Sequence, residues 1–270
     1  MNKTVIVIGL AAVACGCTTV NKPAYDTLIA HRGESFDAPE NTLPAYETAV
    51  DRGFGFECDI YLSSDKRLFT FHDPTLKRTT DGANASACTN VDWTTVSKLN
   101  VGGWGKWKDS KFDPTRPALL EEVLALARPG RKIYVEVKGD NPSWVPYIKA
   151  VFDKEPRATP ETVLFISFGR NVCAELKRQM PEFKVYWLTS RALSAAETVA
   201  ELRALGVDGV DIHYVPETIT AEYIAAVRRA GFEFHVWTID DPDKAAEAFR
   251  RGAQTVTTNR AKYILETLQK

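Results

Sequence analysis

The sequence lacks the usual marks of a disulfide-stapled or membrane-spanning protein. Only five of its 270 residues are cysteine, and the three beyond residue 17 are far apart with no Cys-x-x-Cys spacing. That spacing excludes a zinc ribbon and a disulfide framework, so Cys58, Cys88 and Cys173 are predicted to be small buried side chains. No internal apolar run reaches the ~18–20 residues that a membrane-spanning helix needs.

An excess of charge of one sign is also missing. The chain has 34 Lys and Arg residues against 35 Asp and Glu residues, a net charge of -1. This balance argues against electrostatic capture of nucleic acid or of an anionic membrane surface. At 44% hydrophobic residues the chain is not a disordered polymer. We therefore expect a globular domain that acts on a small molecule, with no prediction of its oligomeric state.

Residues 1–17 have the features of an export signal. Lys3 supplies the positive charge, residues 5–14 are apolar, and Cys15 and Cys17 follow among small residues. Both cysteines end sequences that resemble a bacterial lipobox, so a lipoprotein and a plainly cleaved form both remain open. The prediction is an exported bacterial protein, periplasmic or held at the membrane through lipidated Cys15 or Cys17, with its mature domain at 25–270.

From residue 27 onward, apolar strand-like runs alternate with segments of helical period. The predicted strands are 27–30, 54–60, 133–137, 163–167, 184–188, 209–212, 233–238 and 255–258; the predicted helices are 43–52, 145–153, 170–180, 195–205, 221–230 and 242–251. Eight strands with intervening helices in about 250 residues predict the α/β class and a (β/α)8 TIM barrel. A doubly wound open sheet is the alternative.

One stretch interrupts this alternation. Residues 74–118 contain turn signals and three tryptophans, Trp93, Trp104 and Trp107, but no strong strand or helix. Because so long a structureless loop is unusual in a compact domain, we predict a small insertion after the second strand. Its tryptophans either wall a site or form the insertion's own core, and the second reading is favoured.

Two strands carry acidic residues in alternation with apolar ones. Glu57 and Asp59 share one face of the strand 54–60, and Glu136 and Lys138 share one face near the end of 133–137. Neighbouring buried carboxylates repel each other, and a hard divalent cation with oxygen ligands relieves that repulsion. The pattern predicts a metal site, with Lys138 available to an anion, against the alternative of salt-bridged pairs at the rim.

Histidine is scarce, and its placement is informative. Of four histidines, His31 and His72 follow strand-like runs and precede charged residues. A single histidine is more often structural, but two at equivalent places near candidate metal ligands suggest a general acid and a general base. His213 and His235 lack such neighbours and are predicted to be structural.

These residues together resemble the glycerophosphodiester phosphodiesterase family. The resemblance lies in LIAHRG at 28–33, APENT at 38–42, ECD at 57–59, HDPTL at 72–76, RTT at 78–80 and VEVK at 135–138, and more weakly in SF at 167–168, VDG at 207–209, VWT at 236–238 and TTN at 257–259. It implies a (β/α)8 barrel that hydrolyses a glycerophosphodiester to sn-glycerol 3-phosphate and an alcohol, with one divalent cation, Mg or Ca.

The resemblance also implies roles for individual residues. These are metal binding by Glu57, Asp59 and Glu136, acid and base catalysis by His31 and His72, phosphate contact by Arg32 and Lys138, support of the site by Glu40 and Asn41, and walls of the glycerol side by Phe168 and Trp237. Which histidine is the acid stays open, as does the preferred head group.

The chain also departs from the family pattern. Asn259 occupies a place where members often have Asp, and 117–122 lacks the usual Thr. Neither position is expected to touch the metal or the histidines, so both departures concern substrate fit. Two alternatives remain from the sequence: a phospholipase-type phosphodiesterase acting on a lysolipid, and a non-catalytic lipoprotein that binds phosphorylated polyols.

Overall fold

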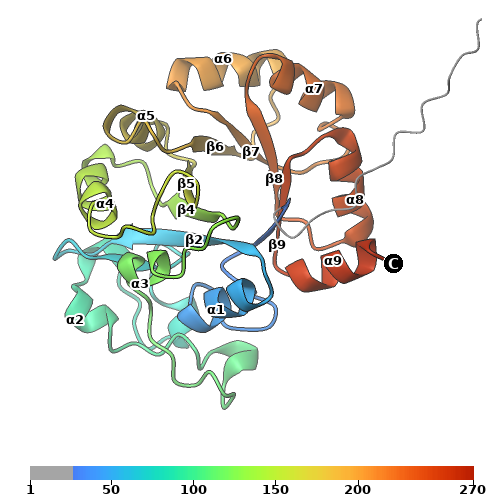
Figure 1. Cartoon of the computed structure of the whole chain (residues 1–270). Helices are drawn as coiled ribbons and strands as arrows, with labels where there is room; N and C mark the ends of the chain where they lie inside the picture. Colours follow the sequence, from blue (N-terminus) through green and yellow to red (C-terminus); the bar gives the residue numbers. More distant parts are fainter. Residues whose placement is uncertain (1–26) are drawn as a thin grey trace, which may run out of the picture.

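A computed structural model describes residues 27–270 (Figure 1). The predicted export signal, with Cys15 and Cys17, lies outside the described residues. The strands are β1 (Leu28–Ala30), β2 (Gly55–Leu62), β3 (Leu68–Thr70), β4 (Ile133–Val137), β5 (Val163–Ser167), β6 (Val185–Thr189), β7 (Gly209–His213), β8 (Glu233–Trp237) and β9 (Thr255–Thr258).

All of these strands except β3 run parallel and close into a barrel. Their order is β1-β9-β8-β7-β6-β5-β4-β2, and β1 also pairs with β2. That last pairing leaves no open edge, which excludes the doubly wound sheet and confirms the predicted (β/α)8 fold class. β3 instead pairs antiparallel with the end of β2, so the two form a hairpin and β3 is not one of the eight barrel strands.

Helices ring the barrel in the order of the chain (Figure 1). They are α1 (Leu43–Asp51), α2 (Trp93–Val96), α3 (Leu120–Leu124), α4 (Val145–Phe152), α5 (Arg170–Gln179), α6 (Ala195–Leu205), α7 (Ala221–Arg229), α8 (Pro242–Arg251) and α9 (Ala261–Leu268). α6 shows how local sequence sets their limits. Ser194 caps its first turn together with Glu197, and Gly206 ends it in a left-handed conformation, which glycine adopts at low cost.

The core has two parts, because the strands of a barrel are covered on both faces. The larger part lies between the sheet and the helices, and the predicted buried cysteines Cys58, Cys88 and Cys173 belong to it. The smaller part fills the barrel interior and consists of Ile29, Tyr134, Leu164, Ile166, Tyr186 and Leu188. Side chains that alternate along each strand therefore serve both cores, and an acid on an inward position enters the interior.

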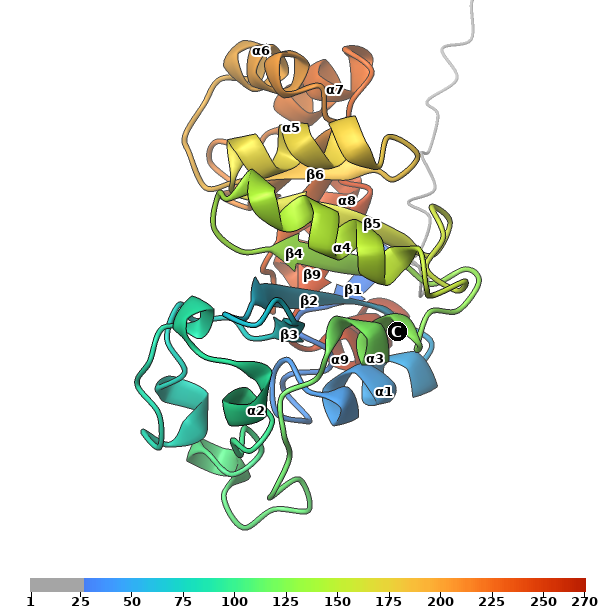
Figure 2. The same cartoon turned by 90° about the vertical axis from the view of Figure 1, so that its left-hand side faces the viewer.

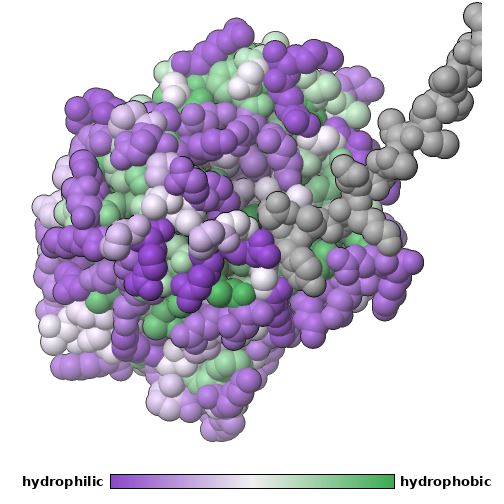
Figure 3. Space-filling model, in the orientation of Figure 1, coloured by the Kyte–Doolittle hydropathy of each residue, from purple (hydrophilic) through white to green (hydrophobic). Residues whose placement is uncertain are grey.

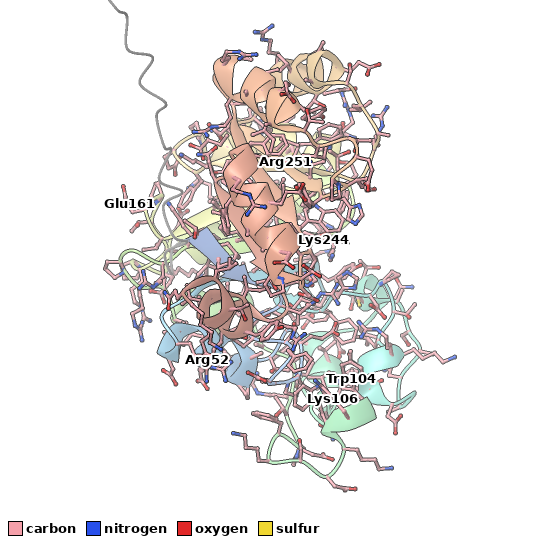
Figure 4. All side chains as sticks on the ribbon, turned by 90° about the vertical axis from the view of Figure 1, so that its right-hand side faces the viewer. Arg52, Trp104, Lys106, Glu161, Lys244 and Arg251 are labelled. Carbon is pink, nitrogen blue, oxygen red and sulfur yellow. The ribbon has the colours of Figure 1, made fainter. Side chains whose placement is uncertain are left out.

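Between β3 and α3 the chain forms only short 3-10 turns and α2, and it projects beside the barrel near α1 (Figure 2). Its tryptophans do not line the main cavity. Trp93 packs on Phe69, with ring centroids 6.4 Å apart, and Trp107 packs on Phe112 at 5.6 Å. Trp104 lies in the same projection and covers the Arg78 guanidinium (Figure 4). Trp107 thus packs within the segment, as predicted, whereas Trp93 packs against β3 and Trp104 covers Arg78, and none of the three walls the cavity.

The surface in the view of Figure 3 is mostly hydrophilic, with apolar residues in small scattered patches. Among residues 27–270 we find no helix that combines the length and the apolar composition required to cross a bilayer.

Candidate active site

The site begins in the sharp turn that follows β1. Arg32 and Gly33 both have positive φ, 54° and 79°. A Cβ on Gly33 would lie 2.6 Å from the Ala45 backbone, so only glycine fits where α1 meets this turn. The turn brings the Arg32 amide within 2.9 Å of Glu57 Oε2, to which it donates a hydrogen bond. His31 is thereby directed into the barrel mouth, with its Nε2 4.0 Å from the same oxygen.

The three predicted acids lie together at this end of the barrel. Asp59 and Glu136 are register partners on β2 and β4, and Glu57 lies two residues before Asp59 on the same face. All three are buried, and each offers an oxygen within 4.8 Å of the others. Cys58 points the other way, into the core beneath the helices. The alternation inferred from the sequence therefore yields a cluster of carboxylates and not separate rim pairs.

Lys138 lies between two of these acids. Its Nζ is 2.6 Å from Asp59 Oδ1 and 2.7 Å from Glu136 Oε1. Arg32 approaches the opposite side of Asp59, with its Nε 3.5 Å from Oδ2. The cluster thus holds three carboxyl groups and two cationic groups, with Glu57 the acid that has no cation in direct contact.

The pKa values of the acids follow from this arrangement. Burial, and then repulsion by Asp59 and Glu136, raise the pKa of Glu57 well above its usual range. Burial and Asp59 raise the pKa of Glu136 to about 8, although Lys138 opposes the shift. Burial also acts to raise the pKa of Asp59, but Lys138 and Arg32 outweigh it and lower that pKa. The surrounding protein therefore stabilises the ionised form of Asp59 and disfavours the ionised forms of Glu57 and Glu136.

His72 reaches the site from the loop that follows β3, not from the end of a parallel barrel strand. Its Nδ1 lies 2.9 Å from Asp73 Oδ1, and Arg78 binds the same aspartate. Burial lowers the pKa of His72 below its usual value. His72 and His31 line one cavity, although they come from different parts of the chain.

The contacts of His31 correct one expectation. Asn259, at the end of β9, was expected to touch neither histidine, and this is wrong: His31 Nδ1 lies 2.7 Å from Asn259 Oδ1. The reason is barrel closure, because β1 pairs with β9 and so brings together two residues that are 228 positions apart in the chain. Asp240 in turn accepts a hydrogen bond from the Asn259 amide. Burial, and then Arg32, lower the pKa of His31 to about 4.

Glu40 and Asn41 lie behind the residues that face the cavity. Asn41 donates to Asp59 Oδ2 at 2.6 Å and accepts from the Asp59 amide, which fixes that carboxyl. Glu40 binds the Arg32 guanidinium at 2.8 Å and also accepts from Arg78. Their geometry suits them to hold Asp59 and Arg32 in place.

The cavity at the barrel mouth has a volume of about 220 Å³. Its lining residues are His31, Arg32, Glu57, His72, Glu136, Lys138, Ile166, Phe168, Leu188, Asp211, Trp237, Thr238 and Thr257. Phe168 and Trp237 meet edge to face, with centroids 5.6 Å apart, and form one wall. Asp211 was missed by the sequence reasoning, as were Ile166, Leu188 and the two threonines; the only signal for Asp211 was an acid on an inward position of a buried strand.

The two remaining histidines have different surroundings. His235 is buried in the barrel interior, where its Nδ1 lies 2.7 Å from Thr255 Oγ1, in agreement with the predicted structural role. His213 is exposed at the end of β7, and its ring lies against Trp237 at 5.3 Å. Neither lines the cavity.

Known proteins are similar to this chain in sequence. The model of the glycerophosphoryl diester phosphodiesterase family matches residues 31–262. A glycerophosphodiester phosphodiesterase from Caldanaerobacter subterraneus is 26% identical over 253 residues, 90% of this chain and 98% of that protein. Human glycerophosphodiester phosphodiesterase 1 is 32% identical over 187 residues, 68% of this chain and 55% of the human protein.

Solved structures give the same result. An Oleispira antarctica phosphodiesterase, in complex with the product sn-glycerol-3-phosphate, superposes with a TM-score of 0.79 and 25% identity, over 90% of this chain and 97% of that one. A structure from Silicibacter pomeroyi superposes with the same TM-score at 18% identity, over 92% of this chain and 95% of that one. The latter supports the fold alone.

Proposed function

This chain belongs to the glycerophosphoryl diester phosphodiesterase family, and we propose that it hydrolyses glycerophosphodiesters to sn-glycerol 3-phosphate and an alcohol with one bound divalent cation, Mg or Ca. The observation that carries the proposal is the meeting of three buried acids and two histidines in one cavity of the barrel mouth.

The acids fit a divalent cation. Glu57 Oε1 is buried without a hydrogen-bond partner in residues 27–270, and burial, followed by the neighbouring Asp59, raises the pKa values of both Glu57 and Glu136. A hard cation with oxygen ligands supplies the missing partner and favours the ionised form of all three carboxyls. Glu57, Asp59 and Glu136 would hold it. Once bound, such an ion polarises a phosphoryl oxygen and lowers the pKa of a coordinated hydroxyl or water.

The charge of the site then suits a phosphodiester. With all three acids ionised, their charges exceed those of Arg32 and Lys138 by one negative charge. A bound divalent cation would change this to one excess positive charge, and a phosphodiester monoanion would then make the site neutral. Arg32 and Lys138 are both nearly buried, so their attraction for phosphate oxygens is weakly screened by water. We assign both as phosphate contacts, held in place by Glu40 and Asp59.

His31 and His72 complete the chemistry. Phosphodiester cleavage needs one group to accept a proton from the nucleophile and one to donate a proton to the leaving alkoxide. Both imidazoles line the cavity, and each has its Nδ1 engaged, by Asn259 and by Asp73, which leaves Nε2 available in each ring. We assign the pair as acid and base without dividing the roles.

A direct assay tests the proposal. The purified mature chain should release glycerol 3-phosphate from glycerophosphocholine, lose that activity in excess EDTA, and recover it when Mg²⁺ or Ca²⁺ is restored. Lysophosphatidylcholine serves as the comparison substrate. Full activity in excess EDTA would refute the requirement for a metal ion. Turnover of the lysolipid alone would support the phospholipase-type alternative. Binding of either compound without turnover would support a non-catalytic binding protein.

We also propose that the protein is exported and lipidated near its N-terminus, on the basis of residues 1–17 of the sequence. Mass spectrometry of the membrane fraction should find acyl chains on Cys15 or Cys17. Substitution of both cysteines by serine should release the protein from the membrane fraction in soluble form. A wild-type protein that is soluble and carries no acyl chain would contradict lipidation and favour a plainly cleaved export signal.

A further inference from the structure

Asp211, on the inward face of β7, is the acid of the cavity that the proposed chemistry does not use. Its side chain is 1% exposed, and its Oδ1 has no hydrogen-bond partner among the described residues. A buried polar atom without a partner is costly, so such an atom on a cavity wall calls for a ligand that pairs with it. Burial, and then Glu136, raise the pKa of Asp211 to about 8.

The surroundings of Asp211 differ from those of the acid cluster. Leu188 is its register partner on β6, and Ile166 and Trp237 also line this end of the cavity. The indole Nε1 of Trp237 donates to the Asp211 backbone carbonyl oxygen at 3.1 Å, which fixes the ring against the backbone of β7, and both residues line the cavity. Phe168 packs against the other side of that ring. A buried carboxyl group with an oxygen that lacks a partner among the described residues thus lies beside apolar walls, where it can pair with a hydroxyl group of a ligand.

The cavity therefore has two ends with different chemistry. One end offers Arg32 and Lys138 to an anion, and the other offers aromatic surface with a single carboxyl group. A ligand that matches both ends has a phosphate joined to a short carbon chain that bears a hydroxyl group. The carbon chain packs on the aromatic rings, and the hydroxyl group pairs with the carboxyl group.

We propose that Asp211 binds a hydroxyl group of the glycerol moiety and makes the enzyme select polyol phosphodiesters over alkyl phosphodiesters of the same length. The proposal rests on the proposed function, since it takes the phosphate group to lie at Arg32 and Lys138. It assigns substrate discrimination to β7, whereas the residues that act on the phosphate group come from β1, β2, β4 and the loop that follows β3.

The test compares two small probes by calorimetry, sn-glycerol 3-phosphate and propyl phosphate, which lacks both hydroxyl groups. Each is titrated into wild-type enzyme and into Asp211→Leu, in the presence of Mg²⁺ or Ca²⁺. Wild type should bind glycerol 3-phosphate at least roughly tenfold more tightly than propyl phosphate. Asp211→Leu should lose most of that preference, because its affinity for glycerol 3-phosphate falls while its affinity for propyl phosphate is kept or improved.

Ile166→Val is the matched control. It changes the same end of the cavity by one methylene and removes no hydrogen bond, so it should weaken both probes alike and keep the preference. Asp211→Ala repeats the test if the leucine variant does not fold, as judged by circular dichroism.

Two results overturn the assignment of Asp211: a wild-type enzyme that does not distinguish the probes, and an Asp211 variant that keeps the full preference. Failure of wild type to bind either probe, together with no turnover of glycerophosphocholine, would instead reject the proposed function itself.

Discussion

The two halves of the barrel contribute different chemistry to one cavity. The half built from β1, β2, β4 and their loops supplies charged and titratable groups: His31, Arg32, Glu57, His72, Glu136 and Lys138. The half built from β5 to β9 supplies mainly apolar and hydroxyl-bearing groups: Ile166, Phe168, Leu188, Asp211, Trp237, Thr238 and Thr257. The first half is suited to stabilise charge in a reaction, and the second is suited to enclose the body of a ligand.

The difference also shows in how the acids are distributed, because the first half crowds three acids together whereas the second half has the single acid Asp211 on its cavity wall. In the first half, burial, and then repulsion by neighbouring acids, raise the pKa values of Glu57 and Glu136. In the second half, Trp237 donates to a carbonyl oxygen and packs on Phe168, so its position is already stabilised without a ligand. Electrostatic repulsion that persists in a folded protein points to the place where a cation and an anion bind. Substitutions should therefore separate into effects on kcat and effects on KM.

The largest expected effect follows removal of either imidazole. His31→Ala and His72→Ala should each lower kcat for glycerophosphocholine by about 10²–10⁴-fold with KM little changed, because proton transfer is lost while the phosphate contacts remain. Steady-state kinetics checks this. His213→Ala, an exposed histidine in the second half, is the control and should keep kcat near wild type. Near-normal turnover in either of the first two variants would contradict the acid and base pairing.

The next effect concerns cation affinity. Glu136→Gln removes one of three carboxylate ligands while Lys138 keeps its ion pair with Asp59, so cation affinity measured by calorimetry should fall by at least roughly tenfold. Glu233→Gln on β8 is the matched control, since Glu233 binds Lys184 and Tyr186 away from the cavity. Equal affinities in wild type and Glu136→Gln would exclude Glu136 as a ligand.

A smaller and different effect is expected in the second half. Trp237→Ala removes the wall beside Asp211 and should raise KM by roughly tenfold while changing kcat less, because apolar contact favours bound substrate and transition state alike. Phe168→Ala should do the same more weakly, since the Phe168 side chain is already 46% exposed. If kcat falls as strongly as in the histidine variants, the division between the two halves is wrong.

The same division explains what could be predicted from the sequence. Acids on apolar strands are conspicuous, because the two-residue period of a strand shows that Glu57 and Asp59 share a face. The strand-helix alternation likewise predicted the barrel, which the closing pair of β1 and β2 confirms. The apolar lining could not be found in this way, since Ile166 and Leu188 have the same sequence pattern as core residues.

Long-range contacts account for the remaining omissions. The meeting of His31 with Asn259 depends on which strands become neighbours when the barrel closes, and no local pattern encodes that pairing. Asp211 was a single acid in a short apolar strand, and its lack of a partner is a property of its surroundings rather than of its sequence. β3 was not among the eight predicted strands, although the run before His72 is strand-like, and it pairs antiparallel with β2 outside the closed ring of parallel strands.

The smallest expected effect tests whether a buried acid of the first half that does not face the cavity also lowers the stability of the fold when it is ionised. Glu34, in the turn after β1, is 1% exposed, does not line the cavity, and lies 3.4 Å from Arg52. Burial raises its pKa from 4.5 to about 7 despite Arg52. The folded state therefore retains a proton that the unfolded state releases, and this contribution to stability declines as pH rises from about 4.5 to about 7.

Glu34→Gln should remove that decline. Wild type and variant should unfold with similar free energies near pH 4.5, whereas above pH 7 the variant should be more stable, by about 2–3 kcal/mol at most. Urea unfolding at several pH values measures the difference. Parallel stability curves would show that Arg52 fully compensates Glu34, and the unfavourable burial of acids would then be confined to the cavity, where a cation relieves it.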